Sequence, residues 1–199
     1  LPHQEMIRDH LTFKGIYAER RNQIRALFDA QSGPVITAHL RRGDFGTGVF
    51  FIAPEGWYLD WLSSLREEHP KLSVYIASDD INAVKSAFSD YPLLTEADLP
   101  KSELAHDFAT DFIALTQGDA IAISNSSFSF AAAMLNTRSK LFVRPVLDRE
   151  RLESFDPWNS SVLLRGSEAE DIGEHVMSKK AVGKSKYRKA KLKKIFKWR

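Results

Sequence analysis

The 199-residue chain contains no cysteine. This excludes disulfide bonds, thiol nucleophiles and cysteine-ligated metal sites. No apolar run approaches the roughly 20 residues that a membrane-spanning helix needs, and the first residues lack the charged-then-apolar order of a signal peptide. The sequence also has no Asp-x-Asp motif. We expect a protein of the cytoplasm, although the absence of cysteine does not by itself settle the compartment.

Acidic residues are missing from the last part of the chain. Positions 179–199 carry 11 Lys or Arg, whereas residues 1–178 carry 17 basic and 26 acidic side chains, a net charge of −9. In this basic tail, Leu192, Ile195 and Phe196 would share one face of a helix. The pattern is typical of a helix on an anionic membrane surface, here the inner face. It is also typical of a disordered solubilising end, and both fit better than a contact with nucleic acid.

The rest of the composition is that of a globular protein, with 43% hydrophobic and 27% charged residues. We divide the chain into a helical lead-in (1–33), one α/β domain (34–178) and the basic tail. Apolar and β-branched runs predict strands at 35–40, 72–77, 120–123 and 140–143, the last closed by Pro145. Apolar periodicity predicts helices at 17–28, 57–68, 80–88, about 105–116 and after Ser127, with Trp57, Trp61 and Leu65 on one face of the second.

Strands that alternate with helices favour βαβ units, so we expect a Rossmann-like, mostly parallel sheet with flanking helices. In such sheets ligands bind beyond the carboxyl ends of the strands. The first strand ends in Arg41-Arg42-Gly43-Asp44. Two guanidinium groups and a glycine suit an anionic ligand such as a phosphate. The alternative is a surface turn whose arginines pair with acidic residues.

The next two strand ends are also polar. Ser78-Asp79-Asp80 fits a helix cap. The segment from Ser124 to Ser129 precedes an alanine-rich helix, so its hydroxyl groups can cap that helix or hold a phosphate at its N-terminus. Asp111 lies within an otherwise apolar helix and needs a partner there, either a basic side chain or the N–H edge of a nucleobase.

Together these segments resemble the GDP-fucose-binding half of the α1,2-, α1,6- and protein O-fucosyltransferase superfamily, and the α1,2-type most closely. The matching motifs are 38–44, with its His-x-Arg-Arg-Gly-Asp ending, 76–80, and 111–119 continuing into 124–130. They occur in order between about residues 34 and 145. The resemblance implies one lobe of a GT-B-type glycosyltransferase and transfer of fucose to a glycan acceptor with inversion.

The resemblance also implies roles for single residues. Arg41 would be the catalytic residue, binding the β-phosphate and stabilising the departing GDP, with His39 near the guanine and Asp111 hydrogen-bonded to the base. The remaining donor-binding residues that it implies are Arg42, Gly43, Asp44, Asp79, Asp80, Ser124, Asn125, Ser126, Ser127 and Phe128. An arginine can stabilise the developing charge without a cation. We therefore expect no metal and no cofactor apart from the GDP-fucose donor.

The chain departs from the family in one respect, since only about 33 residues precede the first strand and an acceptor-binding lobe is not evident. No catalytic base stands out, although Glu55, His69 and His106 are candidates. The glycine-bearing segment 45–51 is either a loop near the sugar or a packing loop. The alternatives are a non-catalytic GDP-sugar-binding module and an interaction protein that uses the basic tail.

Overall fold

The computed structural model of the chain describes residues 3–101, 103, 104, 106 and 108–164. Within them one six-stranded sheet has the order β3-β2-β1-β4-β5-β6. The strands are β1 (Val35–His39), β2 (Ser73–Ala77), β3 (Leu93–Leu94), β4 (Ala120–Ala122), β5 (Phe142–Val146) and β6 (Arg151–Ser154). Neighbouring strands are parallel except for β5 and β6. The predicted Rossmann-like, mostly parallel fold is confirmed.

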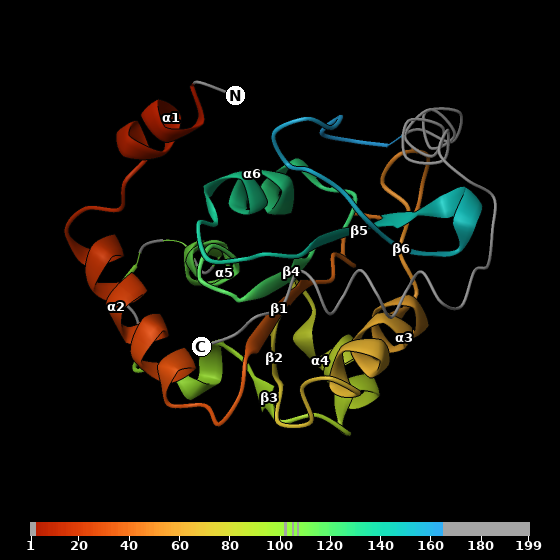
Figure 1. The fold of residues 1–199 in the computed structure, drawn as a ribbon, viewed down its shortest axis with the longest axis horizontal. Helices are drawn as coiled ribbons and strands as arrows, with labels where there is room; N and C mark the ends of the chain where they lie inside the picture. Colours follow the sequence, from red (N-terminus) through yellow and green to blue (C-terminus); the bar gives the residue numbers. More distant parts are fainter. Residues whose placement is uncertain (1–2, 102, 105, 107, 165–199) are drawn as a thin grey trace.

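Helices cover both faces of the sheet (Figure 1). They are α1 (Gln4–His10), α2 (Ile16–Asp29), α3 (Glu55–Arg66), α4 (Ile81–Val84), α5 (Phe108–Leu115) and α6 (Ser127–Leu135), with short 3-10 turns η1 (Lys85–Phe88), η2 (Glu96–Asp98) and η3 (Leu147–Arg149). Because side chains alternate along a strand, each face has its own core. Val35 and Ile121 pack with α2, α5 and α6 on one face, and Ile36 and Ala122 pack with α3 and α4 on the other.

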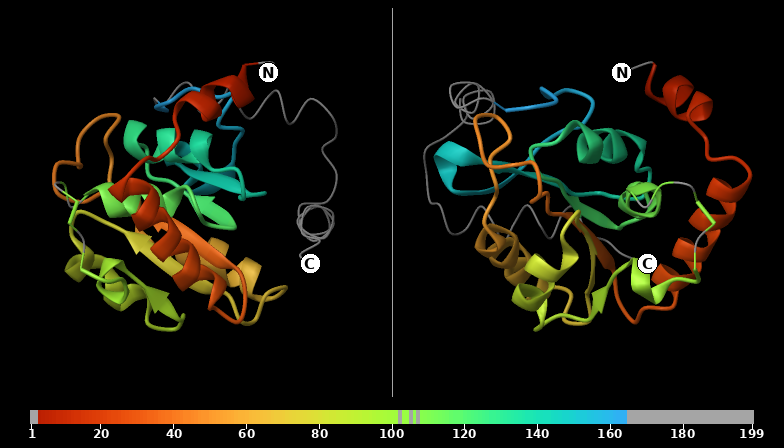
Figure 2. Two further views of the ribbon diagram at one scale, coloured as in Figure 1. Left: turned by 90° about the vertical axis from the view of Figure 1, so that its left-hand side faces the viewer. Right: turned by 180° about the vertical axis from the view of Figure 1, so that it is seen from behind.

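The lead-in belongs to the same core only in part. Ile24 and Phe28 of α2 are buried against the sheet. Helix α1 has no buried residue and lies at the edge of the molecule (Figure 2). It is attached through Arg8, whose Nε donates to the carbonyl of Met134 at 3.0 Å and whose guanidinium lies 5.3 Å from the ring centre of Trp158.

Several predicted elements need correction. Helix α5 begins at Phe108, three residues later than expected, and the 80–88 segment divides into α4 and η1. On α3 the buried stripe is Tyr58, Leu62 and Leu65, while the two tryptophans are only partly buried. The helical face was therefore predicted one residue too early at Trp57 and Trp61. Strands β3 and β6 were not predicted.

Pro145 does not close β5 but lies inside it. The Val143 carbonyl accepts the N–H of Ile123 at 2.9 Å, so alternate residues of β5 face β4. Pro145 is the next residue on that side. The last β4–β5 pair is Ala122 with Val143, so the missing N–H of the proline faces no strand and costs no ladder hydrogen bond.

Among the described residues, no helix is long and apolar enough to cross a bilayer. The basic tail at 179–199, with its expected membrane contact, lies outside the described residues.

Candidate functional site

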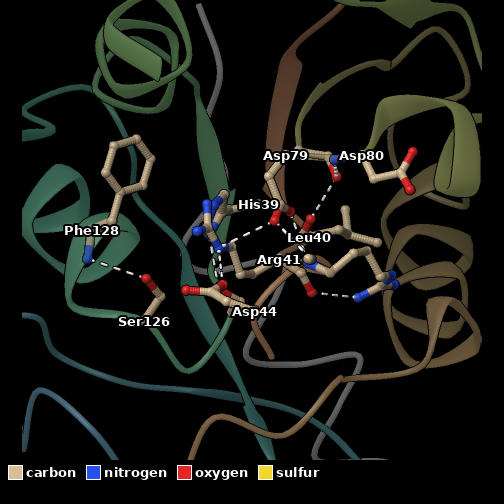
Figure 3. Close-up of polar contacts among 12 residues, drawn as sticks. His39, Leu40, Arg41, Asp44, Asp79, Asp80, Ser126 and Phe128 are labelled. Carbon is tan, nitrogen blue, oxygen red and sulfur yellow. Dashed lines mark hydrogen bonds and ion pairs between the residues drawn. The ribbon is translucent and has the colours of Figure 1, made fainter. Parts of the chain in front are cut away.

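The polar strand ends meet where the strand order reverses, between β1 and β4. Ala38 of β1 pairs with Ala122 of β4, so Arg41 and Asn125 each lie three residues beyond the same level of the sheet. Open α/β sheets bind their ligands at such a switch point. Figure 3 shows the Arg41 turn to one side and Ser126 with Phe128 to the other. We call this region beyond the ends of β1 and β4 the crevice.

Asp79 organises the turn after β1. Its carboxylate accepts the backbone N–H groups of Arg42 at 2.8 Å and Gly43 at 2.7 Å and lies 3.3 Å from Nε of Arg41. A β-carbon on Gly43 would lie 2.7 Å from the Asp79 carboxylate, so this approach requires glycine. The Asp79 side chain thus fixes the 41–44 turn, and its predicted role in donor binding remains a prediction.

Arg41 is held by one edge of its guanidinium. Nε donates to Asp44 at 2.7 Å, and this hydrogen bond raises the pKa of Arg41 and lowers the pKa of Asp44. Within the described residues no hydrogen bond engages the two terminal nitrogens of Arg41, and the side chain is 36% exposed. The turn therefore presents a fixed cation to the crevice.

Arg42 points away to a different partner. Its Nη2 lies 2.6 Å from Glu55, the first residue of α3, and its Nη1 donates to the Arg41 carbonyl at 3.0 Å. Burial is the largest single effect on Glu55 and raises its pKa, but the hydrogen bond to Arg42, a backbone hydrogen bond and the charge of Arg42 together outweigh it, so the pKa of Glu55 is lowered. Arg42 supports the turn, and Glu55 is an ion-pair partner rather than an available base.

His39 ends β1 and is buried. Its Nδ1 lies 2.8 Å from the Ser124 hydroxyl, and its ring centre lies 5.3 Å from that of Phe128. Burial, reinforced by the charge of Arg41, lowers the pKa of His39 to about 3. The imidazole is thus neutral at physiological pH and can serve as a neutral donor or acceptor, but not as a cation.

The far side of the crevice is the N-terminus of α6. Ser126 caps this nine-residue helix, its hydroxyl accepting the N–H of Phe128 at 3.2 Å, and Ser127 is exposed on the first turn. Asn125 differs, because its side-chain amide is buried and occupied: Nδ2 donates to the carbonyls of Val49 and Leu164, and Oδ1 accepts the N–H of Leu164. A role for Asn125 toward a ligand would fall to its backbone.

Asp111 has one partner on β2 and one directly after it. One carboxylate oxygen accepts the Tyr75 hydroxyl at 2.8 Å and the other accepts the N–H of Ser78 at 3.2 Å. Burial raises the pKa of Asp111 to about 7 even though both hydrogen bonds lower it. The predicted contact of Asp111 with a base therefore involves a carboxyl group that is already hydrogen-bonded.

Three further candidate residues, Asp80, His69 and His106, have separate positions in the structure. Asp80 caps α4, accepting the N–H of Ala83 at 3.1 Å, as its position predicted. His69 follows α3 just before β2 begins, with its carbonyl accepting the N–H of Leu72. It lies at the amino-end edge of the sheet, so it cannot act as a base at the carboxyl-end crevice. His106 stacks on Phe108 at 5.2 Å.

Two supporting residues were not identified from the sequence. Tyr58 is fully buried, and its hydroxyl lies 3.2 Å from the His39 carbonyl and 3.3 Å from that of Ile123, which joins the ends of β1 and β4. Arg144 is also buried and lies 3.4 Å from Oδ1 of Asn125. Nothing in the pattern reveals Tyr58. The apolar neighbours of Arg144 in β5 were a usable signal of burial.

The arrangement has the chemistry of an anion site. A fixed guanidinium after β1 and the N-terminus of a capped helix after β4 lie at the same end of two neighbouring strands, and the dipole and first-turn N–H groups of that helix favour negative charge. The Phe128 ring, which is only partly buried, lies 5.3 Å from the buried ring of His39, and an aromatic surface of this kind suits an uncharged ring of a ligand.

The sequence is similar to that of a known glycosyltransferase. The chain is 26% identical over 165 residues to an alpha-1,2-colitosyltransferase from Escherichia coli, a match that covers 79% of this chain and 55% of the relative. The chain thus spans about half the length of this relative. No family model matches the chain.

Two solved structures share a looser likeness. One is NodZ alpha-1,6-fucosyltransferase co-crystallised with GDP, with a TM-score of 0.44 and 17% identity over 70% of this chain and 47% of that one. The other is selenomethionine fucosyltransferase NodZ from Bradyrhizobium, with a TM-score of 0.40 and 17% identity over 70% of this chain and 48% of that one. The colitosyltransferase match confirms the resemblance to a fucosyltransferase-like domain.

Proposed function

We propose that this chain binds a GDP-sugar at the β1–β4 switch point and forms the donor lobe of an inverting, GT-B-type glycosyltransferase. GDP-fucose is the proposed donor and a glycan the acceptor. Because the name of the Escherichia coli relative specifies α-1,2 transfer of colitose, GDP-colitose is the next donor to test.

One observation carries the proposal. Arg41 is anchored through Nε by Asp44 and Asp79, which leaves its terminal nitrogens available to a ligand at the carboxyl ends of β1 and β4. A diphosphate in that position gains a bidentate, charge-assisted contact. Cleavage of the sugar–phosphate bond adds negative charge to GDP, and a preorganised cation stabilises this charge most in the transition state.

The proposal includes no divalent cation. Asp79 already receives two backbone N–H groups and Arg41, and a metal would have to displace them. Donor binding should therefore be unchanged by EDTA. A requirement for Mg²⁺ or Mn²⁺ would contradict this part of the proposal.

A non-catalytic GDP-sugar-binding module is the second candidate. It is favoured by the state of two base candidates, since Glu55 is paired with Arg42 and His69 lies at the opposite edge of the sheet. Such a module would bind the donor normally and transfer nothing to any glycan.

Calorimetric titration of the full chain with GDP, GDP-fucose and UDP tests the proposal. We expect micromolar binding of the two guanine nucleotides and weaker or absent binding of UDP. Incubation with glycan acceptors, followed by NMR of the anomeric proton, then separates an inverting transferase from a binding module. Absence of any guanine nucleotide binding would contradict both candidates.

A further inference from the structure

A pair of phenylalanines follows the turn that presents Arg41. The ring centres of Phe45 and Phe50 lie 5.3 Å apart at an interplanar angle of 51°. Phe50 is 42% exposed, and nearby Ile52 is 43% exposed. Single exposed apolar side chains are common, but a cluster of large ones next to a polar crevice marks a binding surface.

The segment is built as a tight hairpin rather than a loose loop. The Gly46 N–H donates to the Phe50 carbonyl at 2.7 Å, and the Phe50 N–H donates to the Thr47 carbonyl at 3.0 Å. Gly46 has φ 139° and Gly48 has φ 56°, values that glycine adopts without steric cost. We call residues 45–50 the Phe hairpin.

The Phe hairpin is attached to both sides of the crevice. On the β1 side the Phe45 N–H donates to the Arg42 carbonyl at 3.3 Å. On the β4 side the buried amide of Asn125, next to the helix cap Ser126, donates to the Val49 carbonyl at 2.6 Å. The hairpin therefore connects the segments that follow β1 and β4, where the diphosphate is proposed to bind.

We propose that the Phe hairpin is the subsite for the donor sugar and that it selects a 6-deoxyhexose. This rests on the proposed function. In a nucleoside diphosphate sugar the pyranose is joined directly to the β-phosphate, so a β-phosphate at Arg41 brings the sugar within reach of the residues that follow Arg41. The C–H face of the pyranose and the methyl group at C6 are apolar and gain by leaving water against aromatic rings.

A hydroxyl group at C6 has the opposite effect. Against two phenylalanine rings it loses water without gaining a hydrogen-bond partner, which is unfavourable. Fucose and colitose both carry a methyl group at C6, so the subsite accommodates either donor. L-galactose differs from L-fucose only by the C6 hydroxyl group and is the matched probe.

The test compares the affinities of GDP, GDP-L-fucose and GDP-L-galactose for the wild-type chain and for Phe50→Ala. We expect the wild type to prefer GDP-L-fucose over GDP-L-galactose by about fourfold or more, the value for burial of one methyl group. In Phe50→Ala this ratio should approach one, while the affinity for GDP, which lacks the sugar, is retained. Phe50→Leu should keep part of the preference.

Leu147→Ala is the control, because Leu147 is an exposed apolar side chain on η3, outside the hairpin, and its removal should leave the sugar preference unchanged. The inference is overturned if the wild type shows no preference between the two sugars, if Phe50→Ala keeps the preference, or if Phe50→Ala weakens all three ligands equally. Failure of the wild type to bind GDP contradicts the proposed function itself.

Discussion

The Asp79 carboxylate determines the conformation of the Arg41 turn. It can approach the backbone there because Gly43 has no side chain. Two backbone N–H groups donate to the Asp79 carboxylate, which also forms an ion pair with Arg41 and is only 20% exposed. The space beside Gly43 is filled by that same carboxylate. Hydrogen bonds to charged groups contribute about 1.5–3 kcal/mol each. Displacement of Asp79 would therefore destabilise the conformation of the turn.

We therefore expect Gly43→Ala to weaken GDP binding about tenfold, because the new β-carbon forces Asp79 away from Arg42 and Arg41. Gly56→Ala is the matched control. Gly56 lies in α3 with nothing within 4 Å of an added β-carbon, so alanine there should leave binding intact and stabilise the helix slightly. Calorimetry on both variants checks this, and equal affinities in Gly43→Ala and Gly56→Ala would contradict it.

His39 and Asp111 make opposite contributions to stability over the same pH range. The pKa of His39 falls from 6.5 to about 3 on folding, so its contribution is present above 6.5 and is lost as the pH falls toward 3. The pKa of Asp111 rises from 3.8 to about 7, so its contribution is present below 3.8 and is lost as the pH rises through about 7. In the wild type the two changes largely cancel.

Asp111→Asn should remove this cancellation. Relative to the wild type, the free energy of unfolding of the variant should fall by up to about 1.4 kcal/mol per pH unit as the pH is lowered from about 7 to 4. His39→Gln should show the opposite difference. Urea unfolding at several pH values measures both, and parallel pH profiles for the wild type and Asp111→Asn would show that the Asp111 carboxyl does not titrate in this range.

At the scale of elements, Arg144 ties β5 to the segment that covers it. The guanidinium is buried and donates to the carbonyl of Ser161 at 2.7 Å and that of Val162 at 3.3 Å. It also lies over Phe130 and Phe155. No carboxylate among the described residues pairs with it, and burial lowers the pKa of Arg144 to about 10. Backbone carbonyls thus replace a counter-ion.

We expect Arg144→Lys to destabilise the fold by about 2 kcal/mol, because one ammonium group cannot reach carbonyls that the planar guanidinium bridges. Urea unfolding measures the loss, and limited proteolysis between residues 156 and 164 should become faster. Arg149→Lys, an exposed arginine on η3, is the control. Unchanged stability in Arg144→Lys would mean that the carbonyl contacts contribute little.

Elements with strong local patterns were predictable, and those defined by distant partners were not. The apolar runs gave β1, β2, β4 and β5, and the serine run gave the cap of α6. Strand β3 has two residues, and β6 has a single buried leucine. Neither has a run of apolar or alternating residues long enough to predict a strand. The partners of Asp111 also escaped prediction, because Tyr75 lies 36 residues away in the sequence.

At the scale of the whole molecule, the site lies at the carboxyl ends of the two central strands, β1 and β4. Several exposed apolar side chains lie on the same side of the molecule. Phe50, Ile52 and Phe108 all lie beyond carboxyl ends of strands and are more than 40% exposed. The relative from Escherichia coli is nearly twice as long as the matched segment. A second lobe over this edge would cover these side chains and supply the acceptor site.

The basic tail is predicted to act separately from the donor site. We expect the full chain to bind vesicles that contain anionic lipid, with a strength that falls as salt is raised, because the 11 cations of the tail are screened. Deletion of 179–199 should abolish this binding and leave GDP affinity unchanged. Neutral vesicles are the control in a co-sedimentation assay. If the full chain does not bind anionic vesicles, the alternative of a disordered solubilising end is favoured.

The central claim is that Arg41 holds the diphosphate, and the most direct test is calorimetry of GDP and guanosine with Arg41→Ala. Arg138→Ala is the matched control, since Arg138 is similarly exposed and paired with one aspartate, Asp119, just before β4 at the opposite edge. We predict a loss of about tenfold or more for GDP with Arg41→Ala only, and unchanged affinity for guanosine. Wild-type affinity for GDP in Arg41→Ala would contradict the account.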